Sequence, residues 1–549
     1  MKSRLLTGEN ANKKLSCPEF QARWQALIDE CNWSTPFQGI AFATIWFETY
    51  SGAFQPVLLI GQNASEQIEH LLVLAINKET KQIVHVGDNL ATYQCWISKH
   101  TNYSAFLKNA LREIAQINPT GKISFKSLPP KLHRQLKNSP NLITNKFTLR
   151  EKVKRIDCLG DVSASGMAQD NSSEEINENQ SWGVSFDTLS FDGKEQENEA
   201  GKMLRRALIT NDLHQGAVGG SLSFLEDRRM FDFYLALLTV TSEFKMFTVN
   251  AQGNLLALVI GSVTSQEYIF DLISYNIFQG AHSFDKALLL RGAEQLAKRE
   301  GKNIDFTPEG EWTGKYANKI EDVSYFTIYN SDFEFYCDDV LARLKQAFGK
   351  TQLTPDNIHR VIGLLKRVTL KRLLKAAMDT LPSKKRENEY RVYCYSVEEA
   401  MNLPTIDNIE VNQTIDFLKF KPTESWQTRQ NFFSTCLGRF KNGNCGYSYS
   451  DDEFLLHSGW LAPLQDKSYF TEVSKEYIYP EPGAVLFDFY THPKARGQGL
   501  YQKSLTRMLK DATHIPGINY IYISVLADNS PSRHVIEKVG FQYLDSVYG

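Results

Sequence analysis

The sequence has no apolar run close to the roughly 20 residues that a bilayer-spanning helix requires. Its first ten residues include Lys2 and Arg4 but lack the hydrophobic segment of a secretory signal. The net charge of −2 at pH 7 also lacks the positive excess that attracts nucleic acid in bulk. We therefore expect a cytoplasmic globular protein without a nucleic-acid partner.

Cysteine is scarce and scattered. The 549 residues contain 8 cysteines, and no two of them form a Cys-x-x-Cys pair. A disulfide framework or a zinc site needs denser and more regular spacing than this. The cysteines are predicted to be buried or idle thiols in a reducing compartment, and we expect no metal.

What the chain does have is a regular alternation of helical periodicity and apolar runs of strand length, which is typical of an α/β protein. Its length predicts about three domains. Residues 159–182 are acidic and nearly free of large apolar side chains, so they cannot bury enough surface to offset the entropy of ordering. We interpret them as a flexible linker between two lobes, at residues 15–158 and 183–330.

A helical and basic stretch at residues 331–388 is predicted to connect the second lobe to a third lobe at 389–549. Within this connector, residues 361–381 place leucines on one face and most lysines and arginines elsewhere. Such a basic amphipathic helix can rest on an anionic membrane as a peripheral contact. The alternative, which we favour, is a connecting helix that packs on a neighbouring lobe with its lysines in solvent.

The clearest chemical pattern lies in the third lobe. An apolar strand ending near Tyr490 passes through a turn at Pro493 into Arg496-Gly-Gln-Gly499, and an amphipathic helical pattern begins at once. Unpaired N–H groups and the macrodipole at a helix start favour an anion. The two glycines let the backbone approach a pyrophosphate, and Arg496 adds a guanidinium. The alternative is a tight turn with an exposed arginine.

A second strand and helix follow this pattern. The apolar run at residues 518–526 leads into a short helix that Ser530 as N-cap, Pro531 at the first helical position and Gly540 just past the end define. Two strand–turn–helix segments therefore come in succession.

Both segments carry recognisable motifs. The first reads Arg496-Gly497-Gln498-Gly499-Leu500-Tyr501, and the second runs from Asn529-x-x-Ser532 to Lys538-x-Gly540-Phe541. Together they resemble the GCN5-related N-acetyltransferase (GNAT) superfamily, whose pyrophosphate loop usually has Gly or Ala in place of Tyr501. The resemblance implies splayed strands that flank acetyl-CoA or another acyl-CoA as co-substrate. It also implies a binding set of Thr491, Arg496, Gly497, Gln498, Gly499, Leu500, Tyr501, Asn529 and Ser532.

Acyl transfer to an amine needs a neutral nucleophile, a polarised carbonyl and a proton for the departing thiolate. The catalytic candidates are Asp488, His457 and Tyr490. Asp488 can act as a general base, directly or through water, if burial raises its pKa, and the alternative is a hydrogen-bonded structural carboxylate. His457 is a second base candidate, although a lone strand histidine is more often structural, and Glu472 is a weaker third.

The resemblance places the oxyanion donor on a backbone N–H near Tyr490–Thr491. It places the usual general-acid tyrosine at position 536, where this sequence has Ile536. Isoleucine cannot donate a proton, so either solvent protonates the thiolate or another tyrosine does, with Tyr490, Tyr501 and Tyr543 as candidates. The chain stops soon after Phe541, which predicts that the last strand of the family is short or missing.

The first two lobes carry a different set of patterns. They are Thr35-Pro36-Phe37-Gln38, Trp46, Val86-Gly87-Asp88, Tyr93, Ser283-Phe284-Asp285-Lys286, Asp305-Phe306 and Gly310-Glu-Trp-Thr-Gly-Lys315. Over about residues 15–330 these resemble the CelD-type acyltransferase domains of bacterial polysaccharide clusters, relatives of the Fem-type aminoacyl transferases. The family favours Pro-Gly at Phe284-Asp285 and Tyr at Gly314. The alternative is an unrelated α/β pair with chance matches.

The sequence therefore predicts an α/β protein of three GNAT-like lobes, with mixed, mostly antiparallel sheets flanked by helices, and a helical connector. We expect an acyl-CoA-dependent N-acyltransferase that acts on an amine, such as an amino sugar or a polysaccharide or envelope precursor. One alternative is a partly degenerate, non-catalytic binding component of a polysaccharide pathway. The other is a Fem-like aminoacyl transferase, against which the absence of a strongly basic charge argues.

Overall fold

The computed structural model describes most of the chain. The described residues are 2–99, 103–117, 123–138, 147–158, 184–189, 191, 199–251, 253–278, 284–306, 319–328, 389–424 and 427–549. Three predicted features lie outside them, namely the linker at 159–182, the connector with its basic helix at 361–381, and the Gly310–Lys315 pattern.

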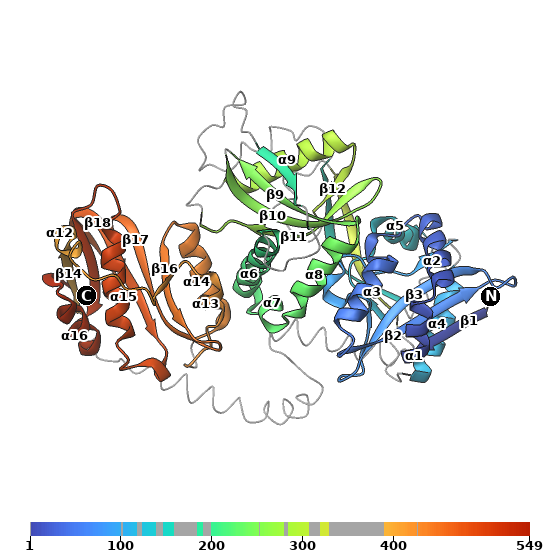
Figure 1. Ribbon diagram of the computed structural model, residues 1–549, viewed down its shortest axis with the longest axis horizontal. Coiled ribbons are helices and arrows are strands. Elements are labelled where there is room, and N and C mark those ends of the chain that lie inside the picture. The colour runs from blue at the N-terminus through green and yellow to red at the C-terminus, as the bar shows by residue number, and fades with distance from the viewer. Residues whose placement is uncertain are drawn as a thin grey trace. The chain divides into compact units, whose positions relative to one another are not determined.

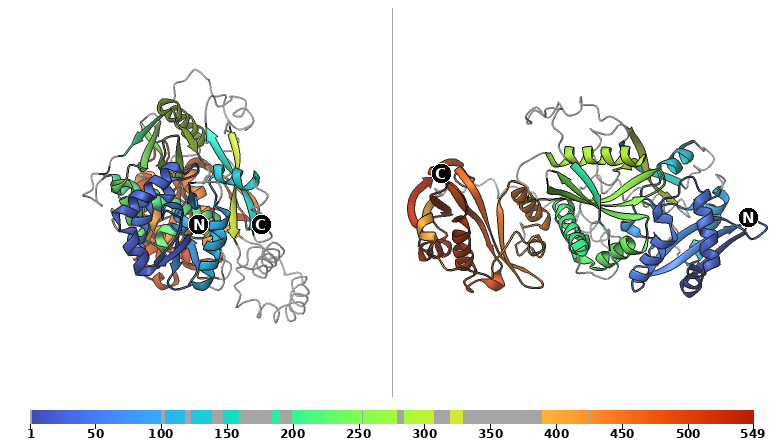
Figure 2. Two further views of the ribbon diagram at one scale, coloured as in Figure 1. Left: turned by 90° about the vertical axis from the view of Figure 1, so that its right-hand side faces the viewer. Right: turned by 45° about the horizontal axis from the view of Figure 1, so that its top comes forward.

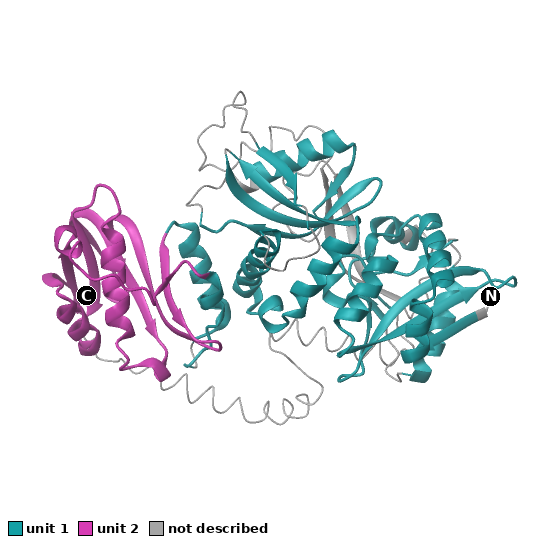
Figure 3. Cartoon of the chain, viewed as in Figure 1, with its two compact units in different colours: residues 1–332, 414–443 teal, residues 333–413, 444–549 magenta. Residues whose placement is uncertain are grey.

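The chain divides into two compact units (Figure 3). Unit 1 comprises Met1–Asp332 and Thr414–Gly443, and unit 2 comprises Phe333–Gln413 and Asn444–Gly549. Three sheets flanked by helices confirm the predicted mixed α/β class (Figure 1). The exact limits of the three predicted lobes stay predictions.

Unit 1 begins with a five-stranded sheet of order β1-β2-β3-β4, in which β5 pairs with β3. The strands are β1 (Lys2–Thr7), β2 (Phe54–Gln62), β3 (Ile68–Asn77), β4 (Ile83–His85) and β5 (Ile97–Ser98). The helices around it are α1 (Gly8–Leu15), α2 (Pro18–Glu30), α3 (Ile40–Thr49), α4 (Ser104–Ile117) and α5 (Pro130–Asn138). α2 starts at a proline and buries Phe20, Trp24 and Leu27 on one face.

The second sheet of unit 1 has eight strands in the order β6-β13-β7-β12-β11-β10-β9-β8. They are β6 (Ile123–Phe125), β7 (Phe147–Cys158), β8 (Val184–Thr188), β9 (Phe244–Ala251), β10 (Asn254–Val263), β11 (Glu267–Tyr275), β12 (Asn303–Asp305) and β13 (Lys319–Ile328). Figure 2 shows α9 (Phe284–Glu300) along one face, and α6 (Glu199–Gly219) and α8 (Arg229–Val240) pack on the other.

The two sheets of unit 1 share one hydrophobic core. Aromatic rings from α3 and α8 meet there, and the centroids of Phe42 and Phe233 lie 5.5 Å apart in an edge-on contact. Phe42 also stacks on Phe244 of β9 at 5.9 Å. β6 and β7 precede residues 159–182, but they pair with β12 and β13, which follow those residues. Strands from both predicted lobes therefore share one sheet.

Unit 1 also contains two helices from far along the sequence, α13 (Thr414–Leu418) and α14 (Arg429–Lys441). α14 packs on α6, as Figure 1 shows. Arg429 Nη1 pairs with Glu226 Oε1 at 2.9 Å, and a Cβ on Gly216 would lie 2.6 Å from the Phe433 ring. Residues 389–549 are predicted as one lobe, and the structure groups α13 and α14 with unit 1.

Unit 2 is built on a seven-stranded sheet of order β15-β16-β17-β18-β19-β14-β20. The strands are β14 (Glu389–Ser396), β15 (Glu410–Val411), β16 (Cys445–Ser450), β17 (Leu455–Phe470), β18 (Lys475–Thr491), β19 (Tyr520–Leu526) and β20 (Gln542–Tyr548). Helices α12 (Val397–Ala400), α15 (Leu500–Ala512) and α16 (Ser530–Val539) supply its helical layer.

The first strand of unit 2 lies near one edge of its sheet and next to the last strand. β14 pairs antiparallel with β19 on one side and with β20 on the other, so that Tyr393 lies opposite both Ile523 and Tyr543. The expectation that the family's last strand is short or missing stays a prediction, while the last strand of this chain itself is present. β20 has 7 residues, and a strand from the start of the unit holds it in place.

The position of β14 leads to a test of stability. Val392 is fully buried in the core on one side of the sheet. We expect Val392→Asp to lower the free energy of unfolding of unit 2 by about 3 kcal/mol or more, because it buries an unpaired charge. Thermal unfolding followed by circular dichroism would measure this, with Tyr548→Asp on the exposed part of β20 as the control. Equal melting temperatures for the two variants would contradict a central role for β14.

Candidate functional site

The site of unit 2 starts from an irregularity in β18. Ser458 of β17 lies opposite Tyr490, but Trp460 lies opposite Phe487, so Asp488 and Phe489 together face the single residue Gly459. Asp488 adopts a left-handed backbone with φ +49°, a conformation that aspartate tolerates better than most residues. This is a β-bulge, which bends a strand and re-aims its side chains.

The bulge directs the Phe489 ring toward β17 and α15. A Cβ on Gly459 would lie only 2.4 Å from that ring, so the ring occupies the place where any other residue would have its side chain. The Tyr501 ring of α15 lies 4.7 Å from Phe489, and the His457 ring lies 6.1 Å from Tyr501. Three rings from three different elements thus pack under the bulge.

His457 is fully buried on β17. Its Nδ1 lies 2.9 Å from Thr491 Oγ1, and its Nε2 is buried without a hydrogen-bond partner among the described residues. Burial lowers the pKa of His457 to about 4. The ring is therefore neutral at pH 7, and its one hydrogen bond fixes the side chain of Thr491.

Just before the bulge, β18 stops pairing with its other neighbour, β19. β18 and β19 pair in parallel only at Ala484–Ile521, Val485–Tyr522 and Leu486–Ile523. β18 continues to Thr491 and β19 to Leu526, and each strand then leads through a turn into a helix. The first turns of α15 and α16 therefore stand at the ends of two strands that no longer pair with each other.

The turn after β18 forms an open backbone cradle. Gly497 and Gly499 have φ of +78° and +73°, and a Cβ on either would meet no atom within 4 Å. Leu500 is buried and fixes the start of α15, while Arg496 is exposed and its guanidinium has no ion pair among the described residues. A left-handed glycine turn before a helix N-terminus, with a free cation beside it, fits a phosphate or pyrophosphate group.

The second helix begins one residue earlier than the sequence suggested. The N-cap of α16 is Asn529, whose side-chain oxygen accepts a hydrogen bond from the Ser532 N–H at 3.3 Å. The prediction of Ser530 as N-cap is thus wrong, since both residue types cap well and lie next to each other. Gly540 ends the helix with φ +112°, as expected.

A hydrogen bond connects the two helices. Ser532 Oγ on α16 donates to the Tyr501 hydroxyl on α15 at 3.0 Å. Burial raises the pKa of Tyr501 to about 12, so this hydroxyl keeps its proton at neutral pH. One turn further along α16, Ile536 is fully buried in the core.

The structure brings most of the predicted site residues of unit 2 together. His457, Thr491, Tyr501 and Ser532 form the two hydrogen-bonded pairs just described, and Asp488 and Tyr490 lie on β18 beside them. The side chain of Asp488 is exposed, so the burial that its role as a base was expected to need is absent. The Gln498 side chain donates to Lys494 O at 3.0 Å and braces the turn.

Two other candidates lie elsewhere. Glu472 is in the turn that joins β17 to β18, at the opposite end of β17 from His457, and its Oε2 accepts from Thr471 Oγ1. Tyr543 is exposed on β20 and donates to Ser546 Oγ at 2.9 Å. Sequence reasoning missed Gly459 and Phe489, although a glycine inside a strand is a known signal of a bulge.

In unit 1, several of the patterned residues join one buried hydrogen-bond network. Gln38 Oε1 accepts from the Thr35 hydroxyl at 2.9 Å, and Gln38 Nε2 donates to Tyr93 O, also at 2.9 Å. The Tyr93 hydroxyl donates to Asp305 Oδ2 at 2.6 Å, and the Thr92 hydroxyl donates to Asp271 Oδ1 at 2.9 Å. Burial raises the pKa of Asp271 well above its ordinary value. This network links β11 and β12 to the segment after β4.

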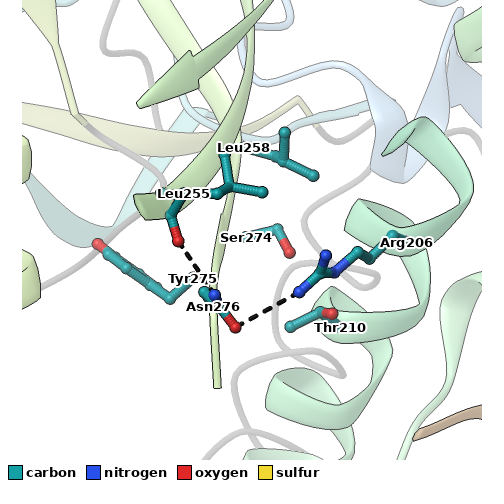
Figure 4. Close-up of a pocket in the computed structure, with 8 residues that line it drawn as sticks. Arg206, Thr210, Leu255, Leu258, Ser274, Tyr275 and Asn276 are labelled. Carbon is teal, nitrogen blue, oxygen red and sulfur yellow. Dashed lines mark hydrogen bonds between the residues drawn. The ribbon is translucent and has the colours of Figure 1, made fainter. Parts of the chain in front are cut away.

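Unit 1 also has a small pocket beside α6, with a cavity volume of about 10 Å³ (Figure 4). Arg206 Nη2 lies 3.5 Å from Asn276 Oδ1, and Asn276 Nδ2 donates to Leu255 O at 3.0 Å. Sites for small molecules usually measure about 300–1,000 Å³. The pocket is too small for an acyl-CoA, and its polar groups bond with one another.

Within the described residues, no group of three or more His, Cys, Asp and Glu side chains is placed to hold a metal ion. None of the described helices combines the length and the apolar character needed to cross a membrane.

The buried histidine predicts a pH dependence. Since the folded pKa of His457 is about 4 and its ordinary value is 6.5, its contribution to stability is complete above pH 6.5 and is lost as the pH falls toward 4. Over this range wild type should lose on the order of 3 kcal/mol more than His457→Gln, measured by chemical unfolding at each pH. His514→Gln, at an exposed histidine of unit 2, is the matched control. Parallel pH profiles for wild type and His457→Gln would contradict the assignment.

Comparison with known proteins finds solved structures with similarity to this chain. One match is L-PGS from Bacillus licheniformis, with 12% sequence identity over 60% of this chain and 96% of that chain and a TM-score of 0.35. A second is a tandem GNAT protein from the clavulanic acid biosynthesis pathway, with 11% identity over 60% of this chain and 99% of that chain and a TM-score of 0.31. A third is a GNAT-family acetyltransferase from Colwellia psychrerythraea, with 11% identity over 66% of this chain and 97% of that chain and a TM-score of 0.22. At such TM-scores no function is transferred. The search of curated proteins finds no match.

A family model does match the C-terminal part. Residues 407–542 match the model described as an acetyltransferase (GNAT) domain, which confirms the resemblance that the two motifs indicated for the third lobe. The match includes the bulge, the glycine turn, α15 and α16. The chain thus carries a GNAT domain in its C-terminal part.

Proposed function

We propose that the protein is an acyl-CoA-dependent N-acyltransferase whose donor site lies in unit 2. The observation that carries this proposal is the open cradle of Gly497 and Gly499 at the start of α15, beside the exposed Arg496. Acyl-CoA carries a pyrophosphate, and such a cradle offers it backbone N–H donors, a helix dipole and a guanidinium. Acetyl-CoA is the donor expected of a GNAT domain.

The proposed acceptor is an amine, such as an amino sugar or a polysaccharide or envelope precursor. The amine nitrogen attacks the thioester carbon, a C–N bond forms, and the C–S bond breaks. The nitrogen loses one proton and the departing thiolate gains one. A cytoplasmic location, where acyl-CoA is available, belongs to this proposal, as does the CelD-type character of unit 1.

The structure suggests how the candidate residues divide these tasks. Asp488 is exposed at the bulge, and although it lacks the expected burial, we assign its carboxylate to take the proton of the amine directly or through water. His457 is fully buried and neutral, so we assign it the positioning of Thr491 through their 2.9 Å contact. Tyr490, half-buried on the same strand, is the proposed donor of a proton to the thiolate.

A second candidate function is acyl-CoA binding without turnover. One observation favours it: Ile536, at the position of the usual acid, is fully buried in the core and leaves no hydroxyl there. Acyl-CoA binding without the formation of any N-acyl product, in a screen of amines and amino sugars, would support this reading over the enzymatic one.

Acetyl-CoA binding measured by calorimetry tests the donor site. Gly499→Glu puts a carboxylate into the cradle, and Arg496→Ala removes the cation, so we expect each to weaken binding by about tenfold or more. Gly517→Glu is the matched control, because Gly517 also has positive φ, +79°, and open space around it but lies beyond the end of α15. Lys475→Ala controls for the loss of a surface cation. Wild-type affinity in Gly499→Glu would move the donor site to another part of the chain.

A further inference from the structure

The hydrogen bond between Tyr501 and Ser532 lies across the entrance to the proposed donor site. Tyr501 is in the first turn of α15, directly after the glycine cradle, and Ser532 is in the first turn of α16. These helices follow β18 and β19, whose pairing stops at Leu486 and Ile523. An extended ligand that enters the gap between the two strands from the cradle must therefore pass between the first turns of α15 and α16.

Side chains already fill that passage. The Tyr501 ring packs on Phe489 at 4.7 Å, and both rings contact the core between the sheet and the helices. The Tyr501 hydroxyl accepts the Ser532 hydrogen bond on the far side of the passage. An extended ligand and the Tyr501 side chain cannot occupy the same space, so one has to displace the other.

We propose that Tyr501 is a gate of the donor site, closed by its hydrogen bond to Ser532, and that the pantetheine arm of acyl-CoA enters only when the ring swings out. This inference rests on the proposed function. It concerns the pantetheine arm alone, because the cradle of Gly497 and Gly499 faces open space in the structure, where the gate is closed. The nucleotide part of the ligand can therefore bind at the cradle while the gate is closed.

The cost of opening sets the size of the effect. To open, Tyr501 gives up its packing on Phe489 and its hydrogen bond, so the open state is a minor population. The apparent affinity falls by the fraction of molecules that are open. A gate that is open about 1–10% of the time weakens binding of a pantetheine ligand about tenfold to hundredfold.

The test compares two ligands on a set of variants. Calorimetry would measure binding of coenzyme A, which has the pantetheine arm, and of adenosine 3′-phosphate 5′-diphosphate, which has only the nucleotide part. We expect Tyr501→Ala to bind coenzyme A about tenfold to hundredfold more tightly than wild type. Tyr501→Phe and Ser532→Ala lose only the hydrogen bond and should gain a smaller factor. Affinity for the nucleotide should not change in any of them.

Tyr543→Ala is the matched control. Tyr543 belongs to the same unit and also shares a hydrogen bond with a serine, Ser546 at 2.9 Å, but it is exposed on β20. Its loss should leave both affinities unchanged. If Tyr501→Ala destabilises the fold, seen as a large fall in melting temperature, the comparison rests on Tyr501→Phe and Ser532→Ala.

The outcomes separate the gate from the proposed function. Unchanged or weaker coenzyme A binding in Tyr501→Ala, with the nucleotide still bound at the cradle, would overturn the gate and leave the donor site in place. Equal gains for both ligands would also overturn it, because a change of the cradle would then explain the result. If neither ligand binds wild type or any variant, the proposed function fails and the gate fails with it.

Discussion

The site in unit 2 depends on how briefly β18 and β19 pair. Three parallel residue pairs, from Ala484–Ile521 to Leu486–Ile523, join the two halves of the sheet. If the ladder continued, hydrogen bonds would close the space between the strands and α15 and α16 could not begin on either side of a gap. The bulge at Asp488 turns the end of β18 away, and antiparallel pairing with β14 holds β19 on its other side. The positions of the glycine cradle, Tyr501 and Ser532 follow from this separation.

Unit 1 also has a short parallel strand pair next to a strand irregularity, but there hydrogen-bonded carboxylates lie beside the strand ends. β11 and β12 pair in parallel over three residue pairs. In β11, Asp271 is an extra residue between Phe270 and Leu272, which lie opposite the adjacent residues Gly261 and Ile260 of β10. There, however, Thr92 and Tyr93 donate hydrogen bonds to Asp271 and Asp305. Buried carboxylates are costly to leave without donors, so a ligand would have to replace both bonds to enter. In unit 2 the Tyr501 side chain lies in the comparable space with one hydrogen bond, to Ser532, and this difference is an argument for the proposed donor site in unit 2.

Local signals were enough to predict the parts of the site that are close in sequence. Gly497, Gly499 and Gly540 have the positive φ that their positions in turns indicated, and α15 buries the periodic apolar residues that its pattern predicted. Contacts between distant residues could not be predicted in this way. The pairing of Tyr393 with both Ile523 and Tyr543 joins segments more than a hundred residues apart, and nothing in the motif containing Tyr501 points to Ser532.

The difference between local sequence signals and three-dimensional contacts also explains the two wrong predictions, the N-cap of α16 and the burial of Asp488. The choice between Asn529 and Ser530 as N-cap depends on which side chain reaches the Ser532 N–H, and the sequence offers two good caps in a row. The exposure of Asp488 depends on the bulge, which shifts the alternation of faces along β18 and which the apolar run on both sides conceals. Where the chain departs from regular geometry, the pattern of residue types predicts the element but not the direction of the side chain.

Opening of the gate also bears on which group protonates the departing thiolate. With the gate closed, the Tyr501 hydroxyl is within the passage, but it is then in the place of the ligand itself. With the gate open, Tyr501 has swung out, and the buried Ile536 offers no hydroxyl in its stead. Tyr543 is exposed and donates to Ser546. Of the tyrosines considered, only Tyr490 lies on the strand beside the bulge in both proposed states, so we propose that it or solvent supplies the proton.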